Sequence, residues 1–427
     1  MMYPNSSAHT ANRIPCRSIP RPTSCSTSCI NRLPETLSLV GLGCSSFSSF
    51  FFDDGKALTV GTLERTNPTV QSWIETIRFA LLDVGITILD TAPWYGHGVS
   101  ETVVGWALES LHLDDGTLCR EDLVINTKVG RYESKASRQF DFSRKATLAS
   151  VRRSLRRLQL NYIDVLQLHD PEYSPSLNLL LDETIPALLE CREKGYCRAL
   201  GLTGYPLEVQ YQILQATLDR FPETKVWDQS LTYGHLNLHD QSLHRGQLLN
   251  TDVSFGAFCA QNEIVVLAAA PVSMGLLSPQ GPPLWHPASA ALQDACRAAV
   301  DLAHSRQCDI VTLALVCALA YPGVPCTLLG MKDVAQVQTL QVIATRFANV
   351  DWSNSYKTIL KHVLTEREYD TYELLQDPVL GPFAGVQTTG EYQWDGVQHV
   401  RSFWAQLPDM EADSWQWLHE PTRKPKD

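Results

Sequence analysis

The sequence predicts an α/β protein folded as a closed (β/α)8 TIM barrel. Strand-like and helix-like segments alternate from residue 37 to residue 347, and eight segments have the character of strands. These strands are continuous apolar runs, which is typical of parallel strands buried on both faces. Such an alternation indicates either a closed barrel or an open, doubly wound sheet.

Short apolar runs that stop at a polar residue or a glycine define the strands. The seventh run is the most strongly apolar, and Pro271 follows it directly. The predicted strands are residues 37–42, 86–89, 123–127, 163–168, 199–202, 226–231, 264–270 and 327–329.

Apolar residues at helical spacing define the segments between the strands. Residues 72–84 carry Trp73, Ile77 and Leu81 along one face, and residues 100–111 open with a Ser-Glu capping signal. Residues 53–70 are polar and are predicted to be a loop. The predicted helices are residues 72–84, 100–111, 144–158, 179–194, 207–218, 290–305, 311–321 and 334–347.

The open-sheet alternative fails at the first strand. A dinucleotide-binding open sheet needs a glycine-rich turn between that strand and its helix. Residues 41–46 read GLGCSS, which lacks the third glycine, and no helical pattern follows directly. The sequence therefore favours the barrel.

Composition narrows the classes of partner. The 427 residues carry a net charge of −11 with a pI of about 5.6, which argues against a nucleic-acid or membrane-surface binder. No apolar run of about 18 residues is present, so no transmembrane helix is expected. The expected partner is a small-molecule substrate, and the expected assembly is a monomer or a weak homo-oligomer.

The twelve cysteines are scattered. No CxxC pair and no Cys/His cluster has the spacing of a zinc site, so no metal is predicted. Several cysteines lie in apolar runs and are interpreted as core residues in a reducing compartment. The expected location is the cytoplasm.

The two ends of the chain differ from its middle. Residues 1–34 contain no Asp or Glu but five prolines and six serines, so they are expected to pack no core and to be mobile. Their composition also fits a mitochondrial targeting segment, although the prolines disfavour the usual amphipathic helix. We therefore expect a leader over residues 1–36, a barrel over 37–350 and a helical or irregular extension over 351–427. The Trp-rich tail either packs against the barrel or closes over the substrate.

Four chemically matched side chains fall at the ends of predicted strands. Asp90, Lys128 and His169 each end a strand, and Tyr95 follows in the loop DTAPWYG. In a (β/α)8 barrel these positions open onto one face, where active sites form. A single Lys or His at such a position is usually solvated or structural, but four matched groups on one rim are harder to attribute to chance.

These four residues can form an acid/base centre. A Tyr hydroxyl has an ordinary pKa of about 10, and a nearby cation such as Lys128 lowers it. Asp90 can hold the ammonium group, and His169 can donate a hydrogen bond to a carbonyl or hydroxyl oxygen. Such a centre interconverts carbonyls and alcohols, but it moves protons only, so the hydride needs a cofactor.

The sequence around these residues resembles the aldo-keto reductases. The resemblance lies in ILDTAPWYG (88–96), LVINTKVGRY (123–132), LRRLQLNYIDVLQLHD (155–170), GLTGYP (201–206), LAAAPVSMGLL (267–277) and LLGMKDVAQV (328–337). The segments LHDPE (168–172) and GLLSPQGPPLWHPAS (275–289) are similar to the L-galactose dehydrogenase and D-arabinose 1-dehydrogenase branch. This resemblance implies oxidation of an aldose at C1 to its lactone, usually with NAD.

The resemblance also implies roles for individual residues. Tyr95 matches the acid/base tyrosine, Lys128 and Asp90 the pair that tunes it, and His169 the orienting histidine. The implied cofactor-binding residues are Thr203, Gly204, Gln229, Ala270, Pro271, Met274, Gly275, Leu276, Gly330, Lys332 and Gln336. The implied substrate-binding residues are Trp94, Tyr132, His169 and Asp170.

One departure leaves alternatives open. Leu340 stands where the family usually has an Asn that hydrogen-bonds adenine. The expected function is an NAD-dependent sugar dehydrogenase, with NADP as the alternative cofactor. The competing hypotheses are an NADPH-dependent reductase of an aldehyde or ketone, and a nucleotide-binding regulatory barrel with little turnover.

Overall fold

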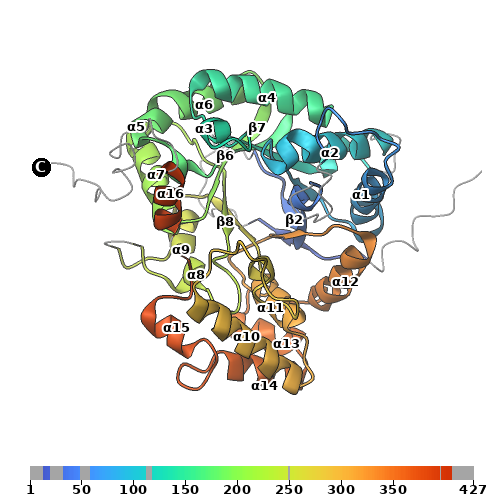
Figure 1. The fold of residues 1–427 in the computed structure, drawn as a ribbon, viewed down its shortest axis with the longest axis vertical. Coiled ribbons are helices and arrows are strands. Elements are labelled where there is room, and N and C mark those ends of the chain that lie inside the picture. The colour runs from blue at the N-terminus through green and yellow to red at the C-terminus, as the bar shows by residue number, and fades with distance from the viewer. Residues whose placement is uncertain are drawn as a thin grey trace, which may run out of the picture.

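Eight parallel strands close into a barrel at the centre of the protein, and helices surround it (Figure 1). The computed structural model describes residues 13–19, 32–48, 58–111, 118–248, 251–394 and 396–405. The order of the strands around the barrel is β10-β3-β4-β5-β6-β7-β8-β9. The predicted fold class is confirmed.

The barrel strands lie close to their predicted positions. They are β3 (Val40–Gly43), β4 (Ile88–Asp90), β5 (Val124–Val129), β6 (Ile163–His169), β7 (Cys197–Gly204), β8 (Gln229–Tyr233), β9 (Val265–Ala269) and β10 (Thr327–Gly330). The predicted first strand is wrong at its start. Residues Thr36–Ser38 form a separate strand, β2, and only Val40–Gly43 joins the barrel.

The helices pack outside the strands. They are α1 (Pro68–Phe79), α2 (Val99–Ser110), α3 (Ala136–Gln139), α4 (Arg144–Leu158), α5 (Leu177–Leu179), α6 (Ile185–Glu193), α7 (Leu207–Arg220), α8 (Ser242–Arg245), α9 (Phe255–Gln261), α10 (Ala290–Ser305), α11 (Ile310–Leu319) and α12 (Val334–Ala344). α1 begins inside the predicted loop 53–70, because Asn67 caps it and Pro68 occupies its first position. α8 and α9 were not predicted. α9 is only seven residues long, which is too short for a clear periodic pattern.

Among the described residues no single helix is long and apolar enough to cross a membrane. The pair α10 and α11 reaches the required length and hydropathy only together, and the two helices are bent by 106° to one another.

Two apolar layers hold the barrel together. One fills its interior and includes Ile88, Val165 and Leu267. The other lies between the strands and the surrounding helices and includes Leu89, Leu166 and Ile213. The alternation of inward and outward side chains along each strand separates these layers, because successive residues point to opposite faces.

Part of the predicted leader is packed, so the expectation that residues 1–34 pack no core is wrong for residues 13–19. The strand β1 (Cys16–Ser18) pairs antiparallel with β2. Ile19 packs with the apolar interior of the barrel, and Arg17 is 4% exposed. The composition of a segment describes its average tendency, and a few well-spaced apolar residues are enough to dock a short strand.

The extension after the barrel is helical in the part that the structure describes. It contains α13 (Tyr356–Val363), α14 (Glu366–Leu375), α15 (Ala384–Thr389) and α16 (Gly396–Trp404). α14 and α15 contact α10, whereas α16 lies apart from them, against residues 171–173 (Figure 1). Two of the predicted tail tryptophans, Trp415 and Trp417, lie outside the described residues.

Candidate active site

The carboxyl ends of three neighbouring strands bring the predicted acid/base residues together. Asp90 ends β4, His169 ends β6, and Lys128 lies in β5 between them. Tyr95 begins a short 3-10 turn after β4. Gly96, His97 and Gly98 have positive φ values of 61°, 54° and 104°, so the chain reverses immediately after Tyr95.

Lys128 is the centre of this group. Its Nζ atom donates to the carboxylate of Asp90, to the carbonyl oxygen of Thr91 at 2.9 Å and to the hydroxyl of Tyr95 at 3.2 Å. The side chain is buried, and burial alone would lower its pKa. The negative charge of Asp90 and the hydrogen bonds outweigh burial, so the pKa of Lys128 is raised and its ammonium form is stabilised.

Tyr95 differs from the sequence-based expectation. Lys128 was predicted to lower the pKa of the phenol, and it does act in that direction. Desolvation of the phenol and the nearby charge of Asp90 act in the opposite direction and prevail, so the pKa of Tyr95 is raised above its ordinary value. The hydroxyl is therefore protonated at neutral pH.

His169 lies beside Tyr95 with its ring edge-on, and the two ring centroids are 6.2 Å apart. Burial lowers the pKa of His169 to about 3, and the positive charges of Lys128 and Arg131 act in the same direction. Its Nδ1 atom is buried without a hydrogen-bond partner among the described residues. The imidazole is thus neutral and suited to hydrogen bonding at an oxygen atom rather than to carrying a charge.

Sequence reasoning missed Gln167, which connects the centre to β8. Its Nε2 atom donates to the second carboxylate oxygen of Asp90 at 2.7 Å, and its Oε1 atom accepts from Gln229 at 3.3 Å. Gln167 precedes His169 by two residues, so both side chains point into the barrel. A polar residue at that spacing inside an apolar strand was the signal that could have identified it. Gln229 lies in register with Gly201, one layer below Thr203.

The loops above the centre form a polar rim. Arg131 donates to Asp170 at 2.8 Å and lies over the ring of Trp94 at 4.0 Å. Asp170 in turn lies 3.6 Å from the Nε2 atom of His169. Two of the predicted substrate residues, Trp94 and Asp170, are therefore next to the acid/base residues.

Tyr132, a third predicted substrate residue, is not part of this rim. Its ring lies near the guanidinium of Arg153 in α4, and burial raises the pKa of its hydroxyl to about 12. Residue 131 forms a bridge with Phe140, so the backbone is extended there and neighbouring side chains point to opposite sides. Arg131 faces the rim, and Tyr132 faces the helices.

The predicted cofactor residues lie at the same end of the barrel. Thr203 and Gly204 end β7, and Gly330 ends β10. After β9 the chain passes through left-handed conformations at Ala270, Ser273, Met274 and Gly275, with φ between 49° and 96°. Three of these residues are not glycine, so the backbone of this loop is strained, as is common where a loop is shaped for a ligand.

The segment after β10 is arranged by its side chains. Asp333 caps α12 through the backbone N–H of Gln336, and the side chain of Gln336 accepts from the backbone N–H of Lys332. Lys332 is exposed. Leu340 is 2% exposed and packs in the core, so its side chain faces away from the exposed surface of α12.

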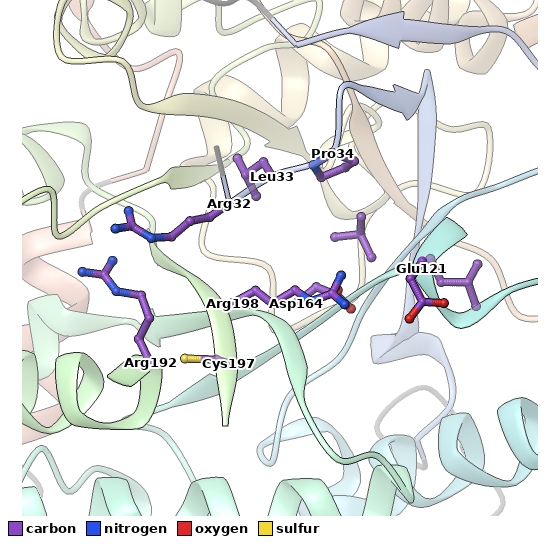
Figure 2. Close-up of a pocket in the computed structure, with 10 residues that line it drawn as sticks. Arg32, Leu33, Pro34, Glu121, Asp164, Arg192, Cys197 and Arg198 are labelled. Carbon is purple, nitrogen blue, oxygen red and sulfur yellow. The ribbon is translucent and has the colours of Figure 1, made fainter. Parts of the chain in front are cut away.

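A cavity of about 510 Å³ lies at the opposite end of the barrel, where the strands begin (Figure 2). Arg32, Arg192 and Arg198 line it, together with Asp164 and Cys197. Its arginines are balanced by buried carboxylates, since Arg32 and Arg192 lie 3.1 Å and 3.6 Å from Asp228 and Arg198 lies 3.6 Å from Asp164. None of the acid/base residues lines this cavity.

Comparisons with known proteins show the family of this chain. Residues 57–354 match the model of the aldo/keto reductase family, and the chain belongs to that family. It is 38% identical over 265 residues to an L-galactose dehydrogenase from Arabidopsis thaliana, covering 62% of this chain and 75% of that protein. It is 29% identical over 257 residues to a D-arabinose 1-dehydrogenase from Saccharomyces cerevisiae, covering 60% and 71%.

The fold is also found in solved structures. An aldo-keto reductase from Bacillus halodurans in its holo form superimposes with a TM-score of 0.55 at 22% identity, covering 84% of this chain and 96% of that one. The family and the aldose dehydrogenase relatives make this protein an NAD(P)-dependent oxidoreductase that acts on alcohol and carbonyl groups.

Proposed function

We propose that this protein oxidises an aldose at C1 to its lactone, with NAD as the hydride acceptor. The observation that carries the proposal is the contact of the Tyr95 hydroxyl with the buried Lys128–Asp90 pair, beside the neutral His169. The similarity to aldose dehydrogenases supports the substrate class.

The chain's own residues perform the proton chemistry. Tyr95, as the phenolate, takes the proton of the C1 hydroxyl, and the ammonium of Lys128 stabilises the phenolate. His169 hydrogen-bonds the C1 oxygen and holds it toward Tyr95. Bound NAD supplies the acceptor for the hydride that leaves C1, and the remaining C1–O bond becomes the carbonyl of the lactone.

The residues at the carboxyl end of the barrel fit such a cofactor. Two features indicate a site shaped for a bound molecule: the strained loop over residues 270–275, and the Nδ1 atom of His169, which has no hydrogen-bond partner in the part of the chain that the structure describes. In this proposal Thr203, Gly204 and Gln229 hold the nicotinamide end. Residues 270–276 hold the pyrophosphate, and Gly330, Lys332 and Gln336 hold the adenosine end.

The preference for NAD over NADP follows from the charges near the adenosine end. A 2′-phosphate would meet one exposed lysine, Lys332, which lacks the bidentate fit of an arginine. Asp333 stands next to it and repels phosphate. Values of kcat/KM for the two cofactors should differ modestly in favour of NAD, and Lys332→Ala should change the ratio by less than about tenfold.

The raised pKa of Tyr95 supports a second function, the reverse reaction. A phenol that is protonated at neutral pH is ready to donate its proton to a carbonyl oxygen. In that case the protein reduces an aldehyde or ketone with NADPH.

A steady-state assay of the purified protein separates the two. NAD and NADP are tested with a panel of aldoses, and NADH and NADPH with aldehydes and ketones, all with Tyr95→Phe as the blank. Oxidation of an aldose at a kcat/KM above that for reduction of any tested carbonyl supports the dehydrogenase. The opposite order would replace it by the reductase.

A further inference from the structure

Arg131 is the rim residue that the acid/base mechanism does not use. It follows β5 by two residues, and its side chain is 25% exposed. Its guanidinium lies over the ring of Trp94 at 4.0 Å and over the ring of Phe140 at 5.3 Å. The guanidinium is thus held at the mouth of the barrel, directly above the residue that precedes Tyr95.

A cluster of aromatic side chains supports the side chain of Arg131. Phe140 stacks on Tyr173 with ring centroids 4.2 Å apart, and Phe403 of α16 packs edge-on against both rings. An aromatic wall built from two loops and the C-terminal extension therefore contacts the guanidinium through Phe140.

Asp170, which follows His169 in the chain, also holds Arg131 in place. It accepts from Arg131 at 2.8 Å, and it adopts a left-handed conformation with φ of 49°. Burial alone would raise the pKa of Asp170, but the positive charge of Arg131 and its hydrogen bond to the carboxylate lower it, so the carboxylate is ionised. A charged donor and a charged acceptor thus stand side by side next to His169.

This arrangement suits one class of substrate. Each sugar hydroxyl both donates and accepts a hydrogen bond, so vicinal hydroxyls need both kinds of partner. Arg131 carries guanidinium donors and Asp170 carries carboxylate acceptors, so the pair offers both kinds of partner. An apolar carbonyl compound gains nothing from such a pair, because it has no hydroxyl that could hydrogen-bond to either charged group.

We propose that the Arg131–Asp170 pair binds the hydroxyls next to C1 and selects polyhydroxylated substrates over apolar ones. This inference rests on the proposed aldose oxidation and names the residues that give it specificity. Arg131 is a specificity-determining residue here, and the proton chemistry stays with Tyr95.

The test compares three substrates in three proteins. The substrates are the best aldose, its 2-deoxy analogue and an apolar primary alcohol. The proteins are the wild type, Arg131→Met and Arg138→Met. Methionine keeps an apolar stem between the two aromatic rings but removes the donors. Arg138 is a matched control, because it lies in the same loop region, pairs with Glu133 and is 66% exposed.

Wild type should prefer the aldose over the 2-deoxy analogue. Arg131→Met should lower kcat/KM for the aldose by about 10–100-fold, mainly through KM, which corresponds to one lost charged hydrogen bond. The variant should change kcat/KM for the apolar alcohol by less than about threefold. It should also bring the ratio of kcat/KM for the aldose to kcat/KM for its 2-deoxy analogue close to one. Arg138→Met should behave as wild type.

Two results would contradict the inference in different ways. If the wild type oxidises aldoses but Arg131→Met lowers kcat/KM equally for all three substrates, Arg131 only supports the fold of the rim. The proposed function then stands. If Arg131→Met keeps the wild-type preference for the aldose over its 2-deoxy analogue, the Arg131–Asp170 pair does not bind the hydroxyls next to C1. A wild type that oxidises no aldose would instead remove the proposed function itself.

Discussion

The proposed acid/base centre is built around Lys128, whose ammonium is buried. A buried charge is costly unless it is paired and hydrogen-bonded. Asp90 provides the opposite charge, Thr91 provides a carbonyl, and Gln167 saturates the second oxygen of Asp90. Among the contacts described for Lys128, only its hydrogen bond to the Tyr95 hydroxyl connects the ammonium to the rim.

Tyr95→Phe tests that connection. The ring keeps its packing, and only the hydroxyl is lost, so the variant should fold and bind NAD as wild type does. The loss of acid/base catalysis should lower kcat by about 10²–10⁴-fold with the best substrate. Steady-state kinetics measures the loss, and quenching of tryptophan fluorescence by NAD serves as the control. A variant with near wild-type kcat would exclude Tyr95 as the proton-transfer residue.

The pKa shifts predict the pH dependence of the reaction. Oxidation needs the phenolate of Tyr95, and its raised pKa means that this form becomes more abundant with increasing pH. The value of kcat/KM for oxidation should therefore rise with pH, by about tenfold per unit between pH 7 and pH 9.

His169 should add no step to that profile near its ordinary pKa. Its folded pKa of about 3 keeps it neutral throughout this range. Initial rates over a series of buffers, with Lys128→Met beside wild type, check both statements. The variant should move the rise to higher pH, and an inflection near pH 6.5 in wild type would show that a histidine titrates in the reaction.

At the scale of elements, two neighbouring helices approach each other closely at a glycine. α2 and α4 meet at Gly105. A Cβ atom at this position would come within 3.0 Å of Leu158 Cα and closer still to the carbonyl oxygen of Arg157. These are backbone atoms, which cannot move away without shifting the end of α4.

Gly105→Ala should therefore destabilise the protein by about 1–3 kcal/mol through overpacking. Gly385→Ala is the matched control, since Gly385 lies exposed in α15 with nothing within 4 Å of an added Cβ. That variant should be neutral or more stable by up to about 1 kcal/mol, because alanine loses less backbone entropy. Equal urea midpoints for the two variants would contradict the close approach of the helices.

At the scale of the whole molecule, segments far apart in the chain close the amino-terminal end of the barrel. Arg17 donates to the carbonyl oxygens of Tyr321, Pro322 and Val324 and lies 3.7 Å above the ring of Trp352. One buried guanidinium thus connects β1, the turn before β10 and the start of the C-terminal extension.

Arg17→Met should leave three buried or partly buried carbonyls without this donor. We expect the free energy of unfolding to fall by at least about 2 kcal/mol, with kcat at 25 °C unchanged, because the proposed acid/base residues lie at the other end of the barrel. Thermal unfolding of Arg17→Met is compared with that of Arg13→Met, whose arginine is exposed and makes one bond to Leu82. Equal Tm values would show that the buried guanidinium of Arg17 contributes no more to stability than the exposed guanidinium of Arg13.

The sequence by itself determined the barrel and the position of its chemistry. Strand-length apolar runs that alternate with helices left a closed barrel or an open sheet, and the missing glycine-rich turn disfavoured the open sheet. The parallel strands of a barrel place their carboxyl ends at one face. That is why Asp90, Lys128 and His169, far apart in the chain, could be assigned to one rim in advance.

Only the tertiary structure decided the rest, because it depends on which side chains meet across strands. The structure identified Gln167 through its contact with Asp90. The extended backbone at Arg131 places this residue at the rim in place of Tyr132. The strand β1 pairs with β2 although its segment lacks the composition of a core. The pKa of Tyr95 likewise depends on the tertiary structure. The sequence showed the cation that lowers it, whereas the desolvation that outweighs the cation exists only in the packed molecule.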